Sequence, residues 1–185
     1  MPHYMPSSIY RMNYIVMIDE ALNERGVYFT HPGHGLRPTS IVVDETPRQI
    51  ELQTNNPDLD PPELDINGIE ISAEPTYPDA PNGETLVTIT FRVRDNISGY
   101  NIGSMRLRDP QGIEHHHYHY SPDRSRLFPE GDPTRWTTHT QTVLLPPGSA
   151  PGTWGLAEMT VRDRAGSFQR YDFTEIIHFE VLDED

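Results

Sequence analysis

Apolar and polar residues alternate regularly along most of the second half of the chain. Between Thr85 and Arg94, every second position is apolar, at Val87, Ile89, Phe91 and Val93. Successive side chains of a strand point to opposite faces, so a purely apolar face indicates a sheet that is buried on one side. Similar alternation recurs at 105–108, 142–145, 154–161 and 179–181. In the segment 154–161 the apolar face changes near Ala157, which predicts a β-bulge there.

Turn sequences separate these alternating segments. They occur at 95–99 (Asp-Asn-Ile-Ser-Gly), 109–112 (Asp-Pro-Gln-Gly), 146–148 (Pro-Pro-Gly) and 163–166 (Asp-Arg-Ala-Gly). Each contains a proline with its fixed φ or a residue that tolerates positive φ. From Leu64 onward the pattern predicts about seven short antiparallel strands, which is typical of an immunoglobulin-like β-sandwich. A β-barrel with the same number of strands is the alternative.

A stretch rich in proline and aspartate, residues 57–63, predicts a linker between two parts of the chain. We expect residues 64–185 to form one complete module. Residues 1–56 contain candidate strands at 12–18, 27–30 and 50–53. When the chain is shifted by 144 positions, Tyr10 falls on Trp154 and Asp19 falls on Asp163. We therefore interpret residues 1–56 as the C-terminal strands of a partial module of the same kind, with two unrelated hairpins as the alternative.

The partial module raises a question of partners, because an isolated hairpin is only marginally stable in water. Its missing strands either precede it in a longer array or come from another copy of the chain by edge addition. Repeated donation of this kind would build a head-to-tail filament.

Composition and charge exclude several classes of function. The chain has 185 residues, with 14 basic and 28 acidic side chains and a formal net charge of −14. This charge disfavours binding to nucleic acid or to an anionic membrane surface. No apolar run is long enough to span a bilayer, so we expect no membrane insertion. Cysteine is absent, which excludes disulfides and thiolate metal sites. The first residues carry neither the basic nor the apolar region of a signal peptide.

Four motifs follow one another along the second part of the chain: the opening Pro-Pro-Glu-Leu (61–64), the turn Asp-Asn-Ile-Ser-Gly (95–99), the strand Gly-Thr-Trp (152–154) and the turn Asp-Arg-Ala-Gly (163–166). Together they resemble the tandem immunoglobulin-like repeats of large bacterial secreted and cell-surface proteins. The resemblance covers about two thirds of the chain. It implies the sandwich fold and an extracellular setting, whereas members of this group serve as spacers, adhesive modules and appendages to enzymes, so fold alone does not give function.

Histidines concentrate between Glu114 and Tyr120. On a strand, His115, His117 and His119 share one face. Their spacing of about 7 Å along the strand prevents all three from reaching one ion, because zinc ligands bind at about 2.1 Å. We expect these rings to cover the sheet, with adventitious binding of a transition metal as the alternative, helped by His139 or Glu114.

Aspartates gather near the linker and in the turns after strands, at Asp58, Asp60, Asp65, Asp95 and Asp163. Carboxylate oxygens are the ligands that calcium prefers, and an acidic linker is a plausible place for them. The set therefore predicts a calcium site that stiffens the linker. The alternative is that these aspartates only cap turns. The chain requires no cofactor on either interpretation.

No catalytic motif accompanies these clusters. The sequence lacks a Gly-x-Ser-x-Gly elbow, a phosphate-binding glycine loop and an HExxH motif. Aromatic residues instead suggest a surface for polysaccharide, with Tyr118, Tyr120 and Trp136 as candidate glycan contacts. We expect a non-enzymatic structural or adhesive module that binds neighbouring modules or other copies of itself. A carbohydrate-binding accessory module of a secreted enzyme is the alternative.

Overall fold

The computed structural model describes residues 4–12, 14–18, 24–28, 41–42, 48–76, 84–126, 128–173 and 177–182. The chain divides into two compact units, one made of Met1–Tyr4 and Asp58–Asp185 and the other of Met5–Pro57. The second unit is thus an insertion into the sequence of the first. In the described part of the chain, no helix is both long and apolar enough to cross a membrane.

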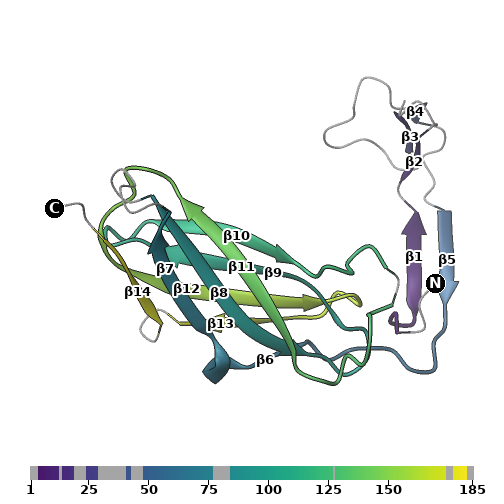
Figure 1. Cartoon of the computed structure of the whole chain (residues 1–185). Helices are drawn as coiled ribbons and strands as arrows, with labels where there is room; N and C mark the ends of the chain where they lie inside the picture. Colours follow the sequence, from purple (N-terminus) through teal and green to yellow (C-terminus); the bar gives the residue numbers. More distant parts are fainter. Residues whose placement is uncertain are drawn as a thin grey trace. The chain divides into compact units, whose positions relative to one another are not determined.

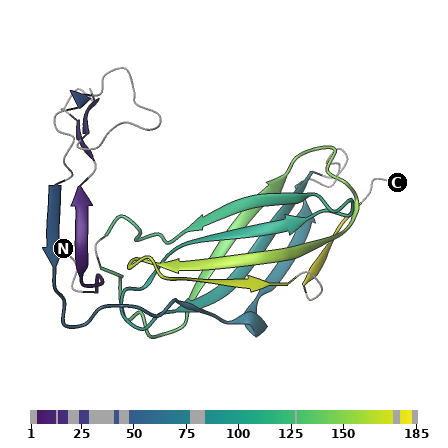
Figure 2. The ribbon, with the colours of Figure 1, turned by 180° about the vertical axis from the view of Figure 1, so that it is seen from behind.

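The larger unit is an antiparallel β-sandwich, which confirms the predicted all-β sandwich; its immunoglobulin-like topology stays a prediction. The first sheet has β11 (Thr137–Leu145) beside β8 (Thr85–Arg94), and β8 also pairs with β6 (Glu63–Leu64) and β7 (Glu70–Pro75). The second sheet runs in the order β10 (Glu114–Tyr120), β9 (Tyr100–Arg108), β12 (Gly152–Asp163) and β13 (Phe168–Asp172). A further strand, β14 (His178–Val181), also pairs with β12. Figures 1 and 2 show the two sheets stacked as layers.

The core lies between the two layers and follows the period-two pattern of the strands. The four apolar residues of β8 that we expected to be buried are all enclosed, as are Trp154, Met159 and Val161 of β12. Burial of each large side chain contributes about 1.5–3 kcal/mol to folding. The prediction of which residues of β8 and β12 point into the core is therefore confirmed.

The predicted bulge in β12 lies where this strand changes partners. Its register with β9 shifts between Leu156 and Glu158. Before the shift, residues 152–155 pair with β14, and after it, residues 158–162 pair with β13. The long strand β12 thus pairs with two shorter strands, β14 before the bulge and β13 after it.

The Met5–Pro57 unit contains a separate set of short strands. One ladder pairs β1 (Ser8–Met12) with β5 (Arg48–Leu52), and the other joins β2 (Tyr14–Ile18), β3 (Glu24–Tyr28) and β4 (Ile41–Val42). Part of the strand expected at 27–30 lies outside the described residues. The immunoglobulin-like origin of residues 1–56 stays a prediction.

The point where this insertion leaves and re-enters the sandwich unit is closed by a hydrogen bond. The backbone amide of Asp58 donates to the carbonyl oxygen of Tyr4 at 2.7 Å. Tyr4 is itself buried, and its ring contacts Phe128 edge to face. The two ends of the insertion are therefore adjacent within the sandwich unit.

Candidate metal centre

Three aspartates from distant parts of the sequence meet at one end of the sandwich. Asp58 follows the insertion, Asp95 comes directly after β8, and Asp163 is the last residue of β12. Each offers one carboxylate oxygen, and these oxygens all lie within 4.8 Å of one another. The exposed fractions of the three residues are 0%, 4% and 1%. We call this set the aspartate cluster.

Backbone amides of nearby turns hold one oxygen of each carboxylate. Asp95 Oδ2 accepts from the amide of Gly99 at 2.6 Å, and positive φ at this glycine (81°) closes the turn. Asp163 Oδ1 accepts from the amides of Gly166 and Ser167 at 2.5 and 2.8 Å. These are the local bonds that Asp-x-x-Ser-Gly and Asp-x-Ala-Gly turns make, because a short carboxylate side chain reaches amides two to four residues ahead.

Asp58 differs, because its carboxylate bonds to a turn far along the sequence. Its Oδ2 accepts from the amide of Ser98 at 2.8 Å. The bond ties the re-entry segment to the turn that follows β8. No local pattern around Asp58 predicts it.

The second oxygen of each carboxylate has no hydrogen-bond partner. These atoms are Asp58 Oδ1, Asp95 Oδ1 and Asp163 Oδ2, and all three are buried. A buried polar atom without a partner is costly, and three negative charges brought together add mutual repulsion. The cluster therefore combines well-fixed carboxylates with three uncompensated oxygens.

The proton affinity of the cluster reflects this environment. Burial raises the pKa of Asp95, against the opposing effect of the Gly99 amide, and the charge of Asp58 raises it further. Burial also raises the pKa of Asp163 to about 7, and the charges of Asp58 and Asp95 add to the effect. Asp95 and Asp163 therefore keep a proton up to a higher pH than an exposed aspartate does.

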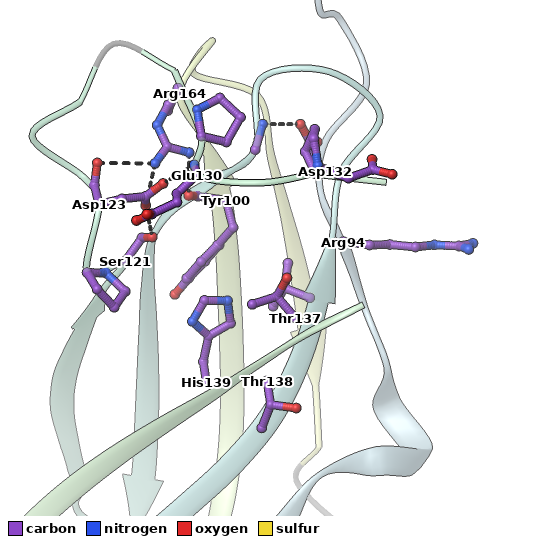
Figure 3. Close-up of a pocket in the computed structure, with 16 residues that line it drawn as sticks. Arg94, Tyr100, Ser121, Asp123, Glu130, Asp132, Thr137, Thr138, His139 and Arg164 are labelled. Carbon is purple, nitrogen blue, oxygen red and sulfur yellow. Dashed lines mark hydrogen bonds and ion pairs between the residues drawn. The ribbon is translucent and has the colours of Figure 1, made fainter. Parts of the chain in front are cut away.

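Arg164, the neighbour of Asp163, supplies positive charge to a different group. Its side chain is 4% exposed and donates to the Tyr100 carbonyl at 2.8 Å and to Asp123 Oδ1 at 2.5 Å. Figure 3 shows this pair at the rim of a pocket. Because Asp123 also accepts from the Glu130 amide, Arg164 anchors the loop that follows β10.

The pocket beneath Arg164 has a volume of about 290 Å³, and its lining includes Asp95, Tyr100 and His139. Burial, together with the neighbouring His119, lowers the pKa of His139 to about 4, against the opposing charge of Asp123. This imidazole is therefore neutral at physiological pH. The hydroxyl of Ser121 donates to Asp123 instead of to an imidazole. Among the residues that line the pocket, this arrangement supplies no activated serine.

Two of the five aspartates predicted for calcium lie outside the cluster. Asp60 accepts from the side-chain amide of Asn96 at 3.0 Å. Asp65 forms an ion pair with Arg92. The structure thus brings together Asp58, Asp95 and Asp163, and gives the other two separate partners.

The three histidines of β10 have separate surroundings. His115 contacts the Trp154 ring and lies 3.4 Å from Asp109, whereas His119 Nδ1 lies 3.0 Å from the Tyr100 hydroxyl. His117 is half-buried, and burial lowers its pKa, as do the charges of the adjacent histidines. Among the described residues, no group of three metal-ligating side chains includes any of them. Adventitious binding of a transition metal there stays a prediction.

The aromatic candidates occupy the surface. Tyr118 and Tyr120 are exposed, and their rings are nearly parallel, with centroids 6.5 Å apart. The guanidinium of Arg124 lies 4.0 Å above the Tyr120 ring. Trp136 is also exposed and is covered in part by Arg94 at 4.7 Å. Tyr120 and Trp136 are thus exposed residues that each have an arginine over the ring.

Sequence reasoning did not identify Arg164 or the Asp58–Ser98 contact. The turn containing Arg164 was visible, but an arginine in a turn is usually exposed, and nothing nearby marks it as buried. Comparison of the chain with protein-family models, with curated proteins and with solved structures found no match.

Proposed function

We propose that this chain is a non-enzymatic structural module of a secreted or cell-surface bacterial protein. The observation that carries this proposal is the burial of the aspartate cluster. Burial raises the pKa of Asp95 and of Asp163, and each of these carboxylates accepts amides of its own turn, after β8 in one sheet and after β12 in the other. Perturbed groups of this kind belong both to structural networks and to catalytic sites, and their near-complete burial favours the structural role.

The order of strands supports an immunoglobulin-like topology for the module. The strands β7, β8 and β11 share one sheet, and β9, β12 and β13 share the other. This division matches strands A, B and E against C, F and G of an immunoglobulin sandwich. The fourth strand, β10, pairs with β9, whereas the seven-stranded constant type places its fourth strand beside the fifth.

Edge strands offer a route to end-to-end assembly. In the described part of the chain, β10 and β11 each pair with one neighbour only, β9 and β8 respectively. Such edges leave backbone groups that another chain can pair with. Size-exclusion chromatography with light scattering tests this part of the proposal: concentration-dependent oligomers are expected, and a monomer at every concentration would contradict strand donation.

Labelling of intact producing cells tests the extracellular setting. An antibody against the sandwich unit is expected to label cells without permeabilisation, and protease added outside is expected to remove the signal. An antibody against a cytosolic protein serves as the control for cell integrity. Labelling that requires permeabilisation would contradict the proposal.

A second candidate function is carbohydrate binding, favoured by the exposed tyrosine pair of β10 with Arg124 above it. Flat aromatic faces stack on sugar rings, and a guanidinium donates to sugar hydroxyls. A glycan array probed with the wild type and with Tyr118→Ala and Tyr120→Ala tests it. Phe168→Ala, at an exposed aromatic of β13, is the matched control. Equal signals from all four proteins would exclude these tyrosines as the binding surface.

A further inference from the structure

We propose that Asp58, Asp95 and Asp163 together bind one calcium ion. The separations of their oxygens fit such an ion. Calcium–oxygen distances are about 2.3–2.6 Å, so two oxygens on the same ion lie at most about 4.6–5.2 Å apart. The three carboxylate oxygens of the cluster all lie within 4.8 Å of one another. Each carboxylate can therefore contribute to one coordination shell without a rearrangement of the turns.

The unpartnered oxygens provide an independent reason for a bound cation. Each aspartate is at least nine-tenths buried and retains one oxygen without a donor. Hydrogen bonds from backbone amides account only for the other oxygen of each carboxylate. Three carboxylates that merely capped turns would not need to lie together, each with one oxygen unpaired and away from water, where repulsion and desolvation both oppose them. A divalent cation removes both penalties.

The chemistry of the ligands selects the class of ion. The cluster consists of carboxylates alone, and such hard oxygen ligands suit calcium or magnesium better than zinc or copper. Magnesium retains several waters and demands octahedral geometry, whereas calcium accepts six to eight oxygens, from protein or water, in irregular arrangements. A buried cluster built from three separate segments therefore favours calcium. Backbone carbonyls or waters would complete the shell.

A calcium ion at this position would join three parts of the sandwich unit. Asp95 follows β8 of the first sheet, Asp163 ends β12 of the second sheet, and Asp58 begins the segment after the insertion. The ion would therefore act as a cross-link between the layers in a chain that has no cysteine. It would also hold Asp58, whose backbone amide bonds to the Tyr4 carbonyl where the two ends of the insertion meet.

The calcium site is a proposal separate from the structural role, and neither proposal requires the other. A module that binds no calcium could still serve as a structural spacer, and a calcium-binding module could have another role. The two proposals therefore fail separately.

Isothermal titration calorimetry of the full chain, after removal of metal with a chelator, tests the site directly. We expect one calcium ion per chain. Asp58→Asn and Asp163→Asn are each expected to weaken binding at least tenfold. Asp60→Asn is the matched control, because it removes an exposed linker carboxylate outside the cluster and should leave the affinity unchanged. Magnesium is expected to bind at least tenfold more weakly than calcium.

Thermal unfolding of the same proteins separates a calcium site from a purely structural cluster. In EDTA at pH 8, Asp163→Asn should be as stable as the wild type or more stable, because it removes one negative charge and can still accept from both turn amides. Calcium should raise the Tm of the wild type and of Asp60→Asn by roughly 5–10 °C at a hundredfold excess over Kd. Because its affinity is at least tenfold lower, the shift for Asp163→Asn at the same calcium concentration should be no more than about half that of the wild type.

Two results would overturn the proposal. One is the absence of both a binding signal and a Tm shift for the wild type in about 10 mM calcium, above the weakest affinities of extracellular calcium modules. The other is equal calcium binding by the wild type, Asp58→Asn and Asp163→Asn, which would place the ion elsewhere. Circular dichroism establishes that each variant is folded, and if Asp163→Asn does not fold, Asp58→Asn and Asp60→Asn provide the comparison.

Discussion

Individual side chains of this protein owe their properties to enclosure between the two sheets. Phe91 illustrates this at the centre of β8, where its ring stacks with His139 and contacts Tyr100 and His119 edge to face. The Tyr100 hydroxyl completes the group by its contact with His119 Nδ1. One apolar ring thus organises a small group of polar rings at the edge of the core.

Truncation of this ring should be costly. We predict that Phe91→Ala lowers the free energy of unfolding by about 3–5 kcal/mol, because it leaves a cavity and removes the surface on which the histidines pack. Leu144→Ala, at a residue of the neighbouring β11 that is 60% exposed, should cost less than about 0.5 kcal/mol. Chemical denaturation measures both. A cost below about 1 kcal/mol for Phe91→Ala would contradict its position in the core.

His139 should make the protein sensitive to acid. Its pKa is about 4 in the folded chain and about 6.5 when unfolded, so its contribution to stability is complete above pH 6.5 and is lost as the pH falls towards 4. The loss amounts to at most about 3 kcal/mol. His139→Phe should remove this part of the decline, whereas His116→Gln, at an exposed histidine, should retain it.

The measurement is the free energy of unfolding between pH 4 and pH 7 in EDTA. Asp163 acts in the opposite direction over this range, because its raised pKa gives stability that is lost as the pH rises towards 7. All three proteins share Asp163, so the difference between their curves isolates the histidine. Parallel curves for the wild type and His139→Phe would show that His139 does not titrate as expected.

At the scale of elements, the ends of strands are joined by polar side chains that cross from one turn to another. Arg164 reaches from the turn after β12 to the carbonyl oxygens of Ser98 and Tyr100 and to Asp123 in the loop after β10. Charge-assisted bonds of this kind are stronger than neutral ones when they are shielded from water. One buried side chain therefore links the turn after β8, the loop after β10 and the turn after β12.

Removal of this side chain should loosen the end of the sandwich. We predict that Arg164→Ala costs about 3–5 kcal/mol, because it leaves Asp123 without its buried partner. Hydrogen exchange should accelerate at residues 121–126 and 128–133 more than in the strands. Arg135→Ala is the matched control, since Arg135 also pairs with an aspartate but is 84% exposed, and it should change stability by less than about 0.5 kcal/mol. Equal effects of the two substitutions would contradict the anchoring role.

At the scale of the whole molecule, one unit of the chain is inserted into the sequence of another. The two ends of the insertion are adjacent in the sandwich unit, where the Asp58 amide bonds to the Tyr4 carbonyl. A separate compact unit whose ends are adjacent can usually be removed without unfolding its host.

We therefore predict that the sandwich folds without the insertion. Replacement of Met5–Pro57 by a short glycine–serine linker should preserve cooperative unfolding, with a Tm within about 5 °C of the corresponding transition in the full chain. Calcium affinity should also be retained, because Asp58 stays in place. Loss of cooperative unfolding would show that the sandwich needs the insertion for its stability.

The strands and turns of the sandwich could be predicted from the sequence alone. Alternation in 85–94 placed Val87 and Phe91 on the buried face, and the change of face near Ala157 located the bulge, because both depend on the period of a single strand. Turns such as 95–99 were equally visible, since Asp95 and Gly99 act through bonds within five residues. Local geometry suffices for such features.

Which aspartates lie together could not be predicted from the sequence and follows from the three-dimensional fold. Asp58, Asp60 and Asp65 are indistinguishable by composition, yet the first is enclosed with Asp95 and Asp163 while the others bond to Asn96 and Arg92. The burial of Arg164 was equally hidden. The physical reason is that these contacts depend on the stacking of two sheets and on the path of the re-entry segment, which bring together residues up to 105 positions apart, from Asp58 to Asp163. Periodicity along one strand contains no information about that distance.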